Sequence, residues 1–268
     1  MINFDELMEE EKKMSFLDHL EELRWRLVKS SVAIICFAIL IWSYQQWIMN
    51  NIFLAMSKSN FISFQLMCKY FGLCMKEIPV KMQSTTVSGQ FSYALMMSML
   101  GGVIFAFPYV FYQLWSFVKP GLKFNEKSVA KGIVFYVSLL FFTGILFGYF
   151  IVAPICIQFF GAYQISNEIE NIFTISSYMS TIISTVFYSG LLFLLPVVSY
   201  LLAKLGIINA DFFRKYRKHA IVGILILAAI ITPPDILSQV IVSIPIIVLY
   251  EIGIIVAVRV EKNKKNEK

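Results

Sequence analysis

The chain has 268 residues, of which 58% are hydrophobic and only 15% charged, and its formal net charge is +6. A soluble domain usually carries about 25% charged residues, and the mean hydropathy here is +0.72, so an ordinary soluble domain is excluded. The net charge alone would suit a nucleic-acid-binding protein. The basic residues instead follow the pattern of a membrane protein, so we expect no nucleic-acid partner.

Long stretches without a charged residue divide the chain into candidate membrane spans. Four of them exceed the ~20 residues that cross the hydrocarbon core of a bilayer. With two shorter segments they predict an all-α, polytopic membrane protein with six transmembrane helices. The six expected spans are 28–48, 90–114, 132–153, 176–203, 219–232 and 236–258.

Prolines mark where these spans bend or end, because proline lacks the amide hydrogen that a helix interior needs. Pro108 predicts a kink near the end of the second span, and Pro154 is expected to close the third. Pro196 interrupts the fourth span. The fifth is short, since about thirteen residues reach only ~20 Å, and a tight turn at 233–235 follows it.

The distribution of Lys and Arg sets the orientation of the spans. Of the 23 such residues, 19 lie on the side that holds both chain termini, and four lie in the first loop on the other side, 49–89. Cytoplasmic loops carry the excess of basic residues, so both termini are expected in the cytoplasm. Cys68 and Cys74 share the outer loop, and their pairing is left open because it requires an oxidising compartment.

A charged helix precedes the first span. Ser15 and Asp18 are spaced like a capping box, and Leu17, Leu20 and Leu27 recur at helical spacing. Glu22 lies four residues before Arg26, an order that favours an ion pair. Glu22 could therefore pair with Arg26 on its own helix, or it could be available to a cationic ligand.

A second carboxylate with two interpretations is Glu251, inside the sixth expected span. An intramembrane carboxylate is a candidate functional group because burying it in lipid is unfavourable. The alternative is a carboxylate near the cytoplasmic interface that pairs with a basic residue. The sequence does not decide between them.

Four motifs, in order along the chain, match the pattern of one known family of membrane proteins. The helix His19–Leu27 resembles the family's N-terminal signature, and Phe117–Glu126 resembles its first cytoplasmic loop. The remaining matches are Gly148–Phe150 with Pro154, and Thr232–Gln239 followed by Pro245 and Leu249–Gly253. By these motifs the chain resembles the TatC family, the receptor and core subunits of the twin-arginine protein translocase. The resemblance spans about residues 15–258, so 1–268 is expected to be a single TatC-like membrane domain with an acidic tail, 1–14, and a basic tail, 259–268.

The resemblance implies a protein that recognises the paired arginines of a signal peptide on folded cargo. Guanidinium groups are bound best by carboxylates in fixed planes, and by resemblance these are Glu22 and Glu126. Phe117, Pro120 and Leu122 are expected to shape the loop beside them. Arg24 is expected to orient the carboxylates or to contact lipid phosphates.

The resemblance also implies partners and an energy source. The partners are TatA-like and TatB-like single-span proteins, in a hetero-oligomer with several copies in the membrane lipid. Transport uses the proton-motive force, and the chain has no phosphate-binding loop of the G-x-x-x-x-G-K-[ST] type. We expect no cofactor, no enzymatic activity, and a location in a bacterial inner membrane rather than an organellar one.

Further residues match structural or partner-contact positions of the family. Asp235 could instead cap the helix that follows it. Leu194 departs from the pattern, because the family commonly has Glu or Gln two residues before the proline of span four; Ser184, Thr185, Tyr188 and Ser189 are candidate substitutes. The residues expected to make these contacts are His19, Asp235, Gln239, Glu251 and Pro196.

Two other classes of function compete with this interpretation. A secondary transporter for a small solute would suit the broken helices and Glu251, but the polar residues gather at the cytoplasmic face. An intramembrane enzyme is disfavoured because His19 and His219 are the only histidines and neither belongs to an H-E-x-x-H motif. His19 and Glu22 could touch a metal, although a surface pair on one helix is the simpler interpretation.

Overall fold

The computed structural model describes residues 16–58, 60–71, 82–118, 132–166, 171–204, 206, 208–231 and 236–266. Five helical stretches among them have the length and apolar composition needed to cross a membrane. These stretches are His19–Ser43, Gly89–Val118, Ile133–Ala162, Ile175–Lys204 and Gln239–Lys262. The all-α, polytopic fold class is therefore confirmed. The count of six spans and the orientation of the termini stay predictions.

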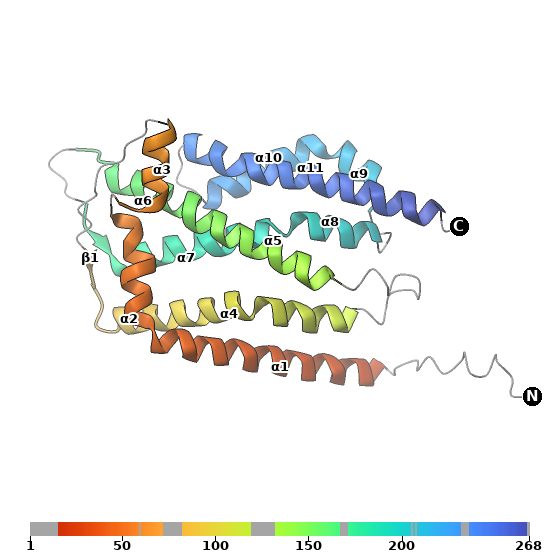
Figure 1. The fold of residues 1–268 in the computed structure, drawn as a ribbon, viewed down its shortest axis with the longest axis horizontal. Helices are drawn as coiled ribbons and strands as arrows, with labels where there is room; N and C mark the ends of the chain where they lie inside the picture. The colour runs from red at the N-terminus through yellow and green to blue at the C-terminus, as the bar shows by residue number, and fades with distance from the viewer. Residues whose placement is uncertain are drawn as a thin grey trace, which may run out of the picture.

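The two N-terminal spans form a pair of long helices that lie side by side (Figure 1). They are α1 (Phe16–Ser43) and α4 (Gly89–Val118), with Pro108 inside the second. Gly102 on α4 allows the close approach, because a Cβ at that position would lie 2.7 Å from the Ile34 carbonyl oxygen of α1. This packing brings the N-terminal end of α1 beside the C-terminal end of α4.

The third span continues past the proline that was expected to end it, so that prediction is wrong. The stretch consists of α5 (Ile133–Phe147), a π-helical segment η5 (Gly148–Val152) and α6 (Ala153–Ala162). Pro154 lies in the first turn of α6. Proline is tolerated there because the first turn of a helix needs no amide hydrogen from it.

The fourth span is broken as predicted. It consists of α7 (Ile175–Leu192) and α8 (Leu195–Lys204), separated by a turn at Phe193 and Leu194 and followed at once by the buried Pro196. Thr174 caps α7 by accepting a hydrogen bond from the Ser177 amide at 3.2 Å. The break thus coincides with the position where proline removes a helical hydrogen bond.

The first outer loop contains helices that the sequence analysis described only as a loop. They are α2 (Gln45–Ile48), the π-helical η1 (Met49–Phe53), the 3₁₀ helix η2 (Leu54–Ser57) and α3 (Ile62–Phe71). Their buried side chains include Phe53, Met56 and Phe64, which pack with α7 in one hydrophobic core together with Phe61, the residue just before α3. Two-residue strands, β1 (Met82–Gln83) and β2 (Phe173–Thr174), pair in parallel beside it.

Cys68 on α3 is disulfide-bonded, and Cys36 and Cys156 are free. Cys74 lies outside the described residues. The disulfide at Cys68 agrees with an oxidising environment for the outer segment.

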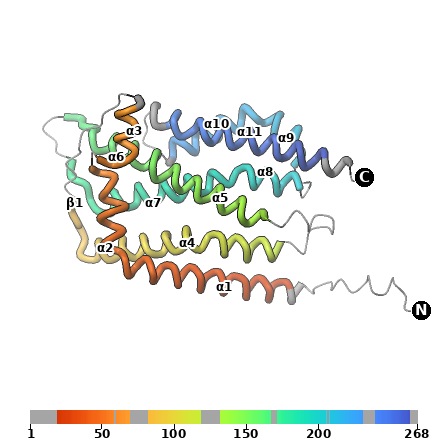
Figure 2. The backbone as a smooth tube through the Cα atoms, viewed as in Figure 1, coloured from red at the N-terminus to blue at the C-terminus, as the bar shows by residue number. Residues whose placement is uncertain are grey.

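The C-terminal part contains α9 (Ala210–Lys215), α10 (Arg217–Ile231) and α11 (Ile236–Asn266). The expected short fifth span is α10, with 15 residues, and it lies against α11 in both views (Figures 1 and 2). The last helix runs well past residue 258, where the sequence analysis ended its span. The turn expected at 233–235 lies outside the described residues.

Candidate functional site

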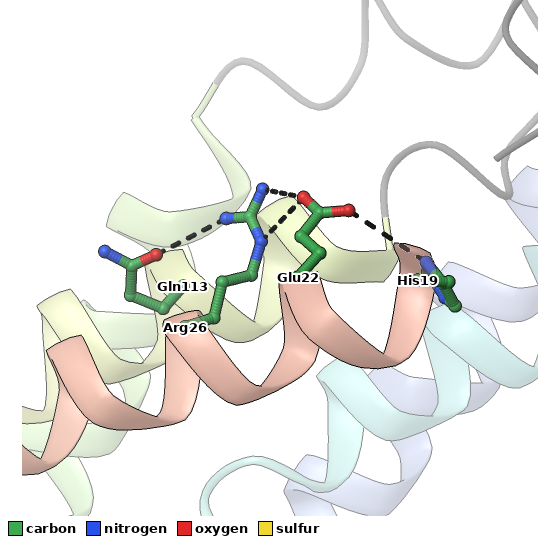
Figure 3. A network of polar contacts seen from close by, with 4 residues as sticks. All are labelled: His19, Glu22, Arg26 and Gln113. Carbon is green, nitrogen blue, oxygen red and sulfur yellow. Dashed lines mark hydrogen bonds and ion pairs between the residues drawn. The ribbon is translucent and has the colours of Figure 1, made fainter. Parts of the chain in front are cut away.

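A network of polar side chains joins α1 to the C-terminal part of α4 (Figure 3). It contains His19, Glu22 and Arg26 from α1 and Gln113 from α4. The three residues of α1 are spaced three and four apart, so they lie along one side of the helix. This is the end of the bundle that the charge distribution predicts to be cytoplasmic.

Glu22 is paired with Arg26 through only one of its two carboxylate oxygens. Arg26 Nε donates to Glu22 Oε1 at 2.9 Å, and Arg26 Nη2 donates to the same oxygen. The other oxygen, Oε2, is buried and has no hydrogen-bond partner within the described ranges. His19 Nδ1 lies 4.0 Å from this oxygen. Glu22 therefore keeps one acceptor oxygen available.

Arg26 also reaches across to the second helix. Its Nη1 donates to Gln113 Oε1 at 3.3 Å, and Gln113 is 6% exposed. Gln113, which is 87 residues from Arg26 in the chain, was not among the predicted site residues. Its signal was a polar amide inside an otherwise apolar span, which is a candidate functional position in a membrane helix.

An aromatic contact lies on the other side of Glu22. The ring of His19 stacks on Phe117 with centroids 4.2 Å apart and an angle of 15° between the planes. Phe117 follows Gln113 by four residues on α4, so both face α1. The predicted site residues His19, Glu22 and Phe117 are thus brought together.

Arg24, the other predicted residue of this site that the structure describes, is not part of the network. Arg24 lies on an exposed part of α1, and its guanidinium carbon is 5.8 Å from the centre of the Trp25 ring. Glu126, Pro120 and Leu122 lie outside the described residues, as does Asp235. Their predicted roles stay predictions.

Glu251 is paired with a basic residue, as the second interpretation of the sequence proposed. Its Oε2 accepts a hydrogen bond from Arg217 Nη2 at 2.8 Å, between α11 and the first residue of α10. Gln239 links the same two helices by donating from Nε2 to the Leu225 carbonyl at 3.0 Å. Glu251 and Gln239 therefore each connect α11 to α10.

Pro196 and the polar residues of α7 can also be placed. Pro196 is buried close to Gly253 of α11. Among the candidate substitutes for the missing polar residue, Thr185 and Ser189 are buried, Ser184 donates to the Ser180 carbonyl, and Tyr188 is 47% exposed. Tyr188 is therefore the member of this group best placed to contact a neighbouring helix.

Within the residues that the structure describes, no three His, Cys, Asp or Glu side chains are grouped closely enough to hold a metal ion.

The fold and the network define a polytopic helical membrane protein with a half-satisfied carboxylate where two long helices end. The family model "Sec-independent protein translocase protein (TatC)" matches residues 18–245. A TatC protein from Blattabacterium is 36% identical over 95% of this chain and 99% of its own length. One from Helicobacter pylori is 36% identical over 92% of this chain and 90% of its own.

Solved structures agree with these matches. The crystal structure described as "Twin Arginine Translocase Receptor- TatC in DDM" is similar with a TM-score of 0.69 and 28% identity. The match covers 88% of this chain and 98% of that one. A second TatC crystal structure has a TM-score of 0.67, also at 28% identity.

The chain belongs to the TatC family of Sec-independent protein translocase proteins. It is a multi-pass membrane subunit of the Tat translocase, and it is a transport component rather than an enzyme. A small-solute transporter, the alternative weighed from the sequence, is not favoured.

Proposed function

We propose that this subunit recognises twin-arginine signal peptides, with Glu22 binding one of the two guanidinium groups. The observation that carries the proposal is the buried Glu22 Oε2, which has no hydrogen-bond partner in the described part of the chain. A buried acceptor without a partner costs about 1–3 kcal/mol. A cationic ligand with N–H donors would remove that cost.

The surroundings of Glu22 suit an arginine side chain. A guanidinium group donates in a planar fork that matches a carboxylate, and it also stacks on aromatic rings. The stacked pair of His19 and Phe117 supplies such rings beside Glu22. By family resemblance, Glu126 would bind the second arginine of the signal peptide.

The remaining parts of the proposal rest on membership of the Tat translocase. The subunit would assemble with TatA-like and TatB-like single-span proteins, in several copies, in a bacterial inner membrane. The proton-motive force would drive export of the folded cargo that the bound signal peptide carries.

The test is export of a folded reporter that carries a twin-arginine signal peptide. Glu22→Gln keeps the size of the side chain and removes its charge, so it should abolish export while the protein still inserts in the membrane. Glu21→Gln is the matched control, because Glu21 is an exposed neighbour on the same helix. Equal export by the two variants would remove Glu22 from the proposed site.

A further inference from the structure

We propose that Arg26 is an internal competitor of the signal peptide: it occupies Glu22 in the resting protein and moves onto Gln113 when a guanidinium group of the cargo binds. This inference rests on the proposed function, because it assumes that Glu22 receives the cargo arginine. It adds two residues, Arg26 and Gln113, that control how readily the site opens.

In the resting protein, Arg26 is paired with Glu22 through one carboxylate oxygen. Arg26 directs two donors, Nε and Nη2, at the single oxygen Oε1 of Glu22. A guanidinium that binds a carboxylate in the two-bond, parallel arrangement needs both oxygens. The free Oε2 can accept a first bond from an incoming arginine, but the second bond requires Oε1. Arg26 must therefore leave Oε1 before the cargo arginine is fully bound.

Gln113 is the residue to which Arg26 can move. The Nη1–Gln113 Oε1 bond measures 3.3 Å, beyond the usual 2.7–3.2 Å for a hydrogen bond of this kind, so it can shorten when Arg26 is released. Gln113 is almost fully buried, so its carbonyl oxygen has little competition from water. A displaced Arg26 thus keeps a hydrogen-bond acceptor within reach.

The pairing of Arg26 with Glu22 changes how tightly a cargo arginine binds. A cargo guanidinium must displace Arg26 to reach Oε1, so Arg26 lowers its affinity. A lysine ammonium is a point donor that can bond to the free Oε2 alone, so Arg26 affects it less. The Glu22 and Arg26 side chains are only 23% and 22% exposed, so solvent screens their pairing in part. The affinity of a single arginine is then kept low, and a signal peptide that gains from several contacts at once binds better.

The experiment measures binding of a fluorescent synthetic signal peptide to membrane vesicles that contain the full chain. Arg26→Gln should tighten binding of the twin-arginine peptide about fivefold, a factor that corresponds to an ion pair of ~1 kcal/mol. The weaker binding of a twin-lysine peptide should tighten by a smaller factor, because an ammonium group can bond to Oε2 without displacing Arg26. Lys29→Gln is the matched control, because it removes the same charge from an exposed position on the same helix. Arg26→Gln binding that is weaker than, or equal to, that of Lys29→Gln would overturn the inference.

Two further variants test the role of Gln113 and protect against a misfolded Arg26→Gln protein. Gln113→Leu should weaken binding of the twin-arginine peptide about fivefold, since a displaced Arg26 loses its acceptor and one hydrogen bond contributes about 1 kcal/mol. Arg26→Lys keeps the charge but lacks the planar fork, so it should tighten binding by a smaller factor than Arg26→Gln. Tighter binding by Gln113→Leu, or weaker binding by Arg26→Lys, would also overturn the inference.

Failure of the inference differs from failure of the proposed function. If Glu22→Gln binds the twin-arginine peptide as well as the unchanged protein does, the proposed function fails. If Glu22→Gln loses binding but Arg26→Gln behaves like Lys29→Gln, only the competitor role of Arg26 fails.

Discussion

Arg217 and Glu251 are 34 positions apart in the chain, and their side chains form an ion pair with the guanidinium Nη2 2.8 Å from the carboxylate Oε2. Arg217 is the first residue of the short helix α10, and Glu251 lies within α11. The pair therefore fixes one end of α10, a helix of only 15 residues, to its long neighbour.

We predict a small but measurable coupling between these two residues. The side chains of Arg217 and Glu251 are 48% and 37% exposed, so solvent screening limits the coupling to about 0.5 kcal/mol. A double-mutant cycle with Arg217→Gln and Glu251→Gln, followed by thermal unfolding in detergent, measures it. The control pair Asp211 and Arg214, 3.9 Å apart and more exposed, should show no coupling. Equal coupling in both pairs would contradict the role of the Arg217–Glu251 contact.

A stronger effect is expected at Tyr178 of α7. Its hydroxyl donates to the Phe53 carbonyl at 2.7 Å, and the side chain is only 4% exposed. Tyr178→Phe leaves that carbonyl without this donor, which should lower the free energy of unfolding by about 1–3 kcal/mol. Thermal unfolding of Tyr178→Phe beside Tyr188→Phe, an exposed position on the same helix, tests this. Equal melting temperatures for both variants would show that the Tyr178 hydroxyl does not stabilise the core between α7 and the helices of the first outer loop.

Replacing each of two helical glycines with alanine should change the stability of the protein in opposite directions. A Cβ at Gly102 would lie 2.7 Å from the Ile34 carbonyl oxygen and 3.0 Å from the Ala38 nitrogen, so Gly102→Ala must push α1 away from α4. Overpacking of this kind destabilises by about 1–3 kcal/mol. Gly223 has no atom within 4 Å of such a Cβ, and Gly223→Ala should stabilise α10 by ~0.5–1 kcal/mol. Melting temperatures of the two variants check the signs.

The disulfide at Cys68 offers a test of the predicted orientation. If α3 lies on the outer side, a thiol reagent that does not cross membranes should label Cys68 in intact spheroplasts, and only after reduction. Cys36 and Cys156 are free but lie within candidate spans, so this reagent should not reach them. Reduction frees both thiols of the disulfide, so Cys68→Ser, which leaves the other thiol free, should be labelled without reduction. Labelling of Cys68 only in inverted vesicles would reverse the predicted topology.

Much of the fold could be predicted because membrane spans follow from local properties of the chain. The apolar stretches gave the long helices, and Pro196 gave the break between α7 and α8. Pro154 misled the prediction because a proline ends a helix only where an amide hydrogen is needed, and at the start of α6 none is. The helices of the first outer loop were missed because their apolar residues are stabilised by packing against α7, which is not a local property.

Part of the candidate site could be predicted because Glu22 and Arg26 are close together in the sequence. The spacing of Glu22 and Arg26 on one helix indicated their pairing, although it could not show that one carboxylate oxygen stays free. Gln113 joins the network only because α4 packs against α1, a contact between distant parts of the chain. The contact between His19 and Phe117 likewise depends on this packing.

The most direct test of the central claim compares signal peptides that carry Arg-Arg or Lys-Lys at the paired position, in binding to the full chain and to its Glu22→Gln variant. We predict that the unchanged protein binds the Arg-Arg peptide more tightly than the Lys-Lys peptide, and that Glu22→Gln loses most of this preference while Glu21→Gln keeps it. An unchanged preference in Glu22→Gln would contradict the claim that this carboxylate recognises an arginine of the cargo.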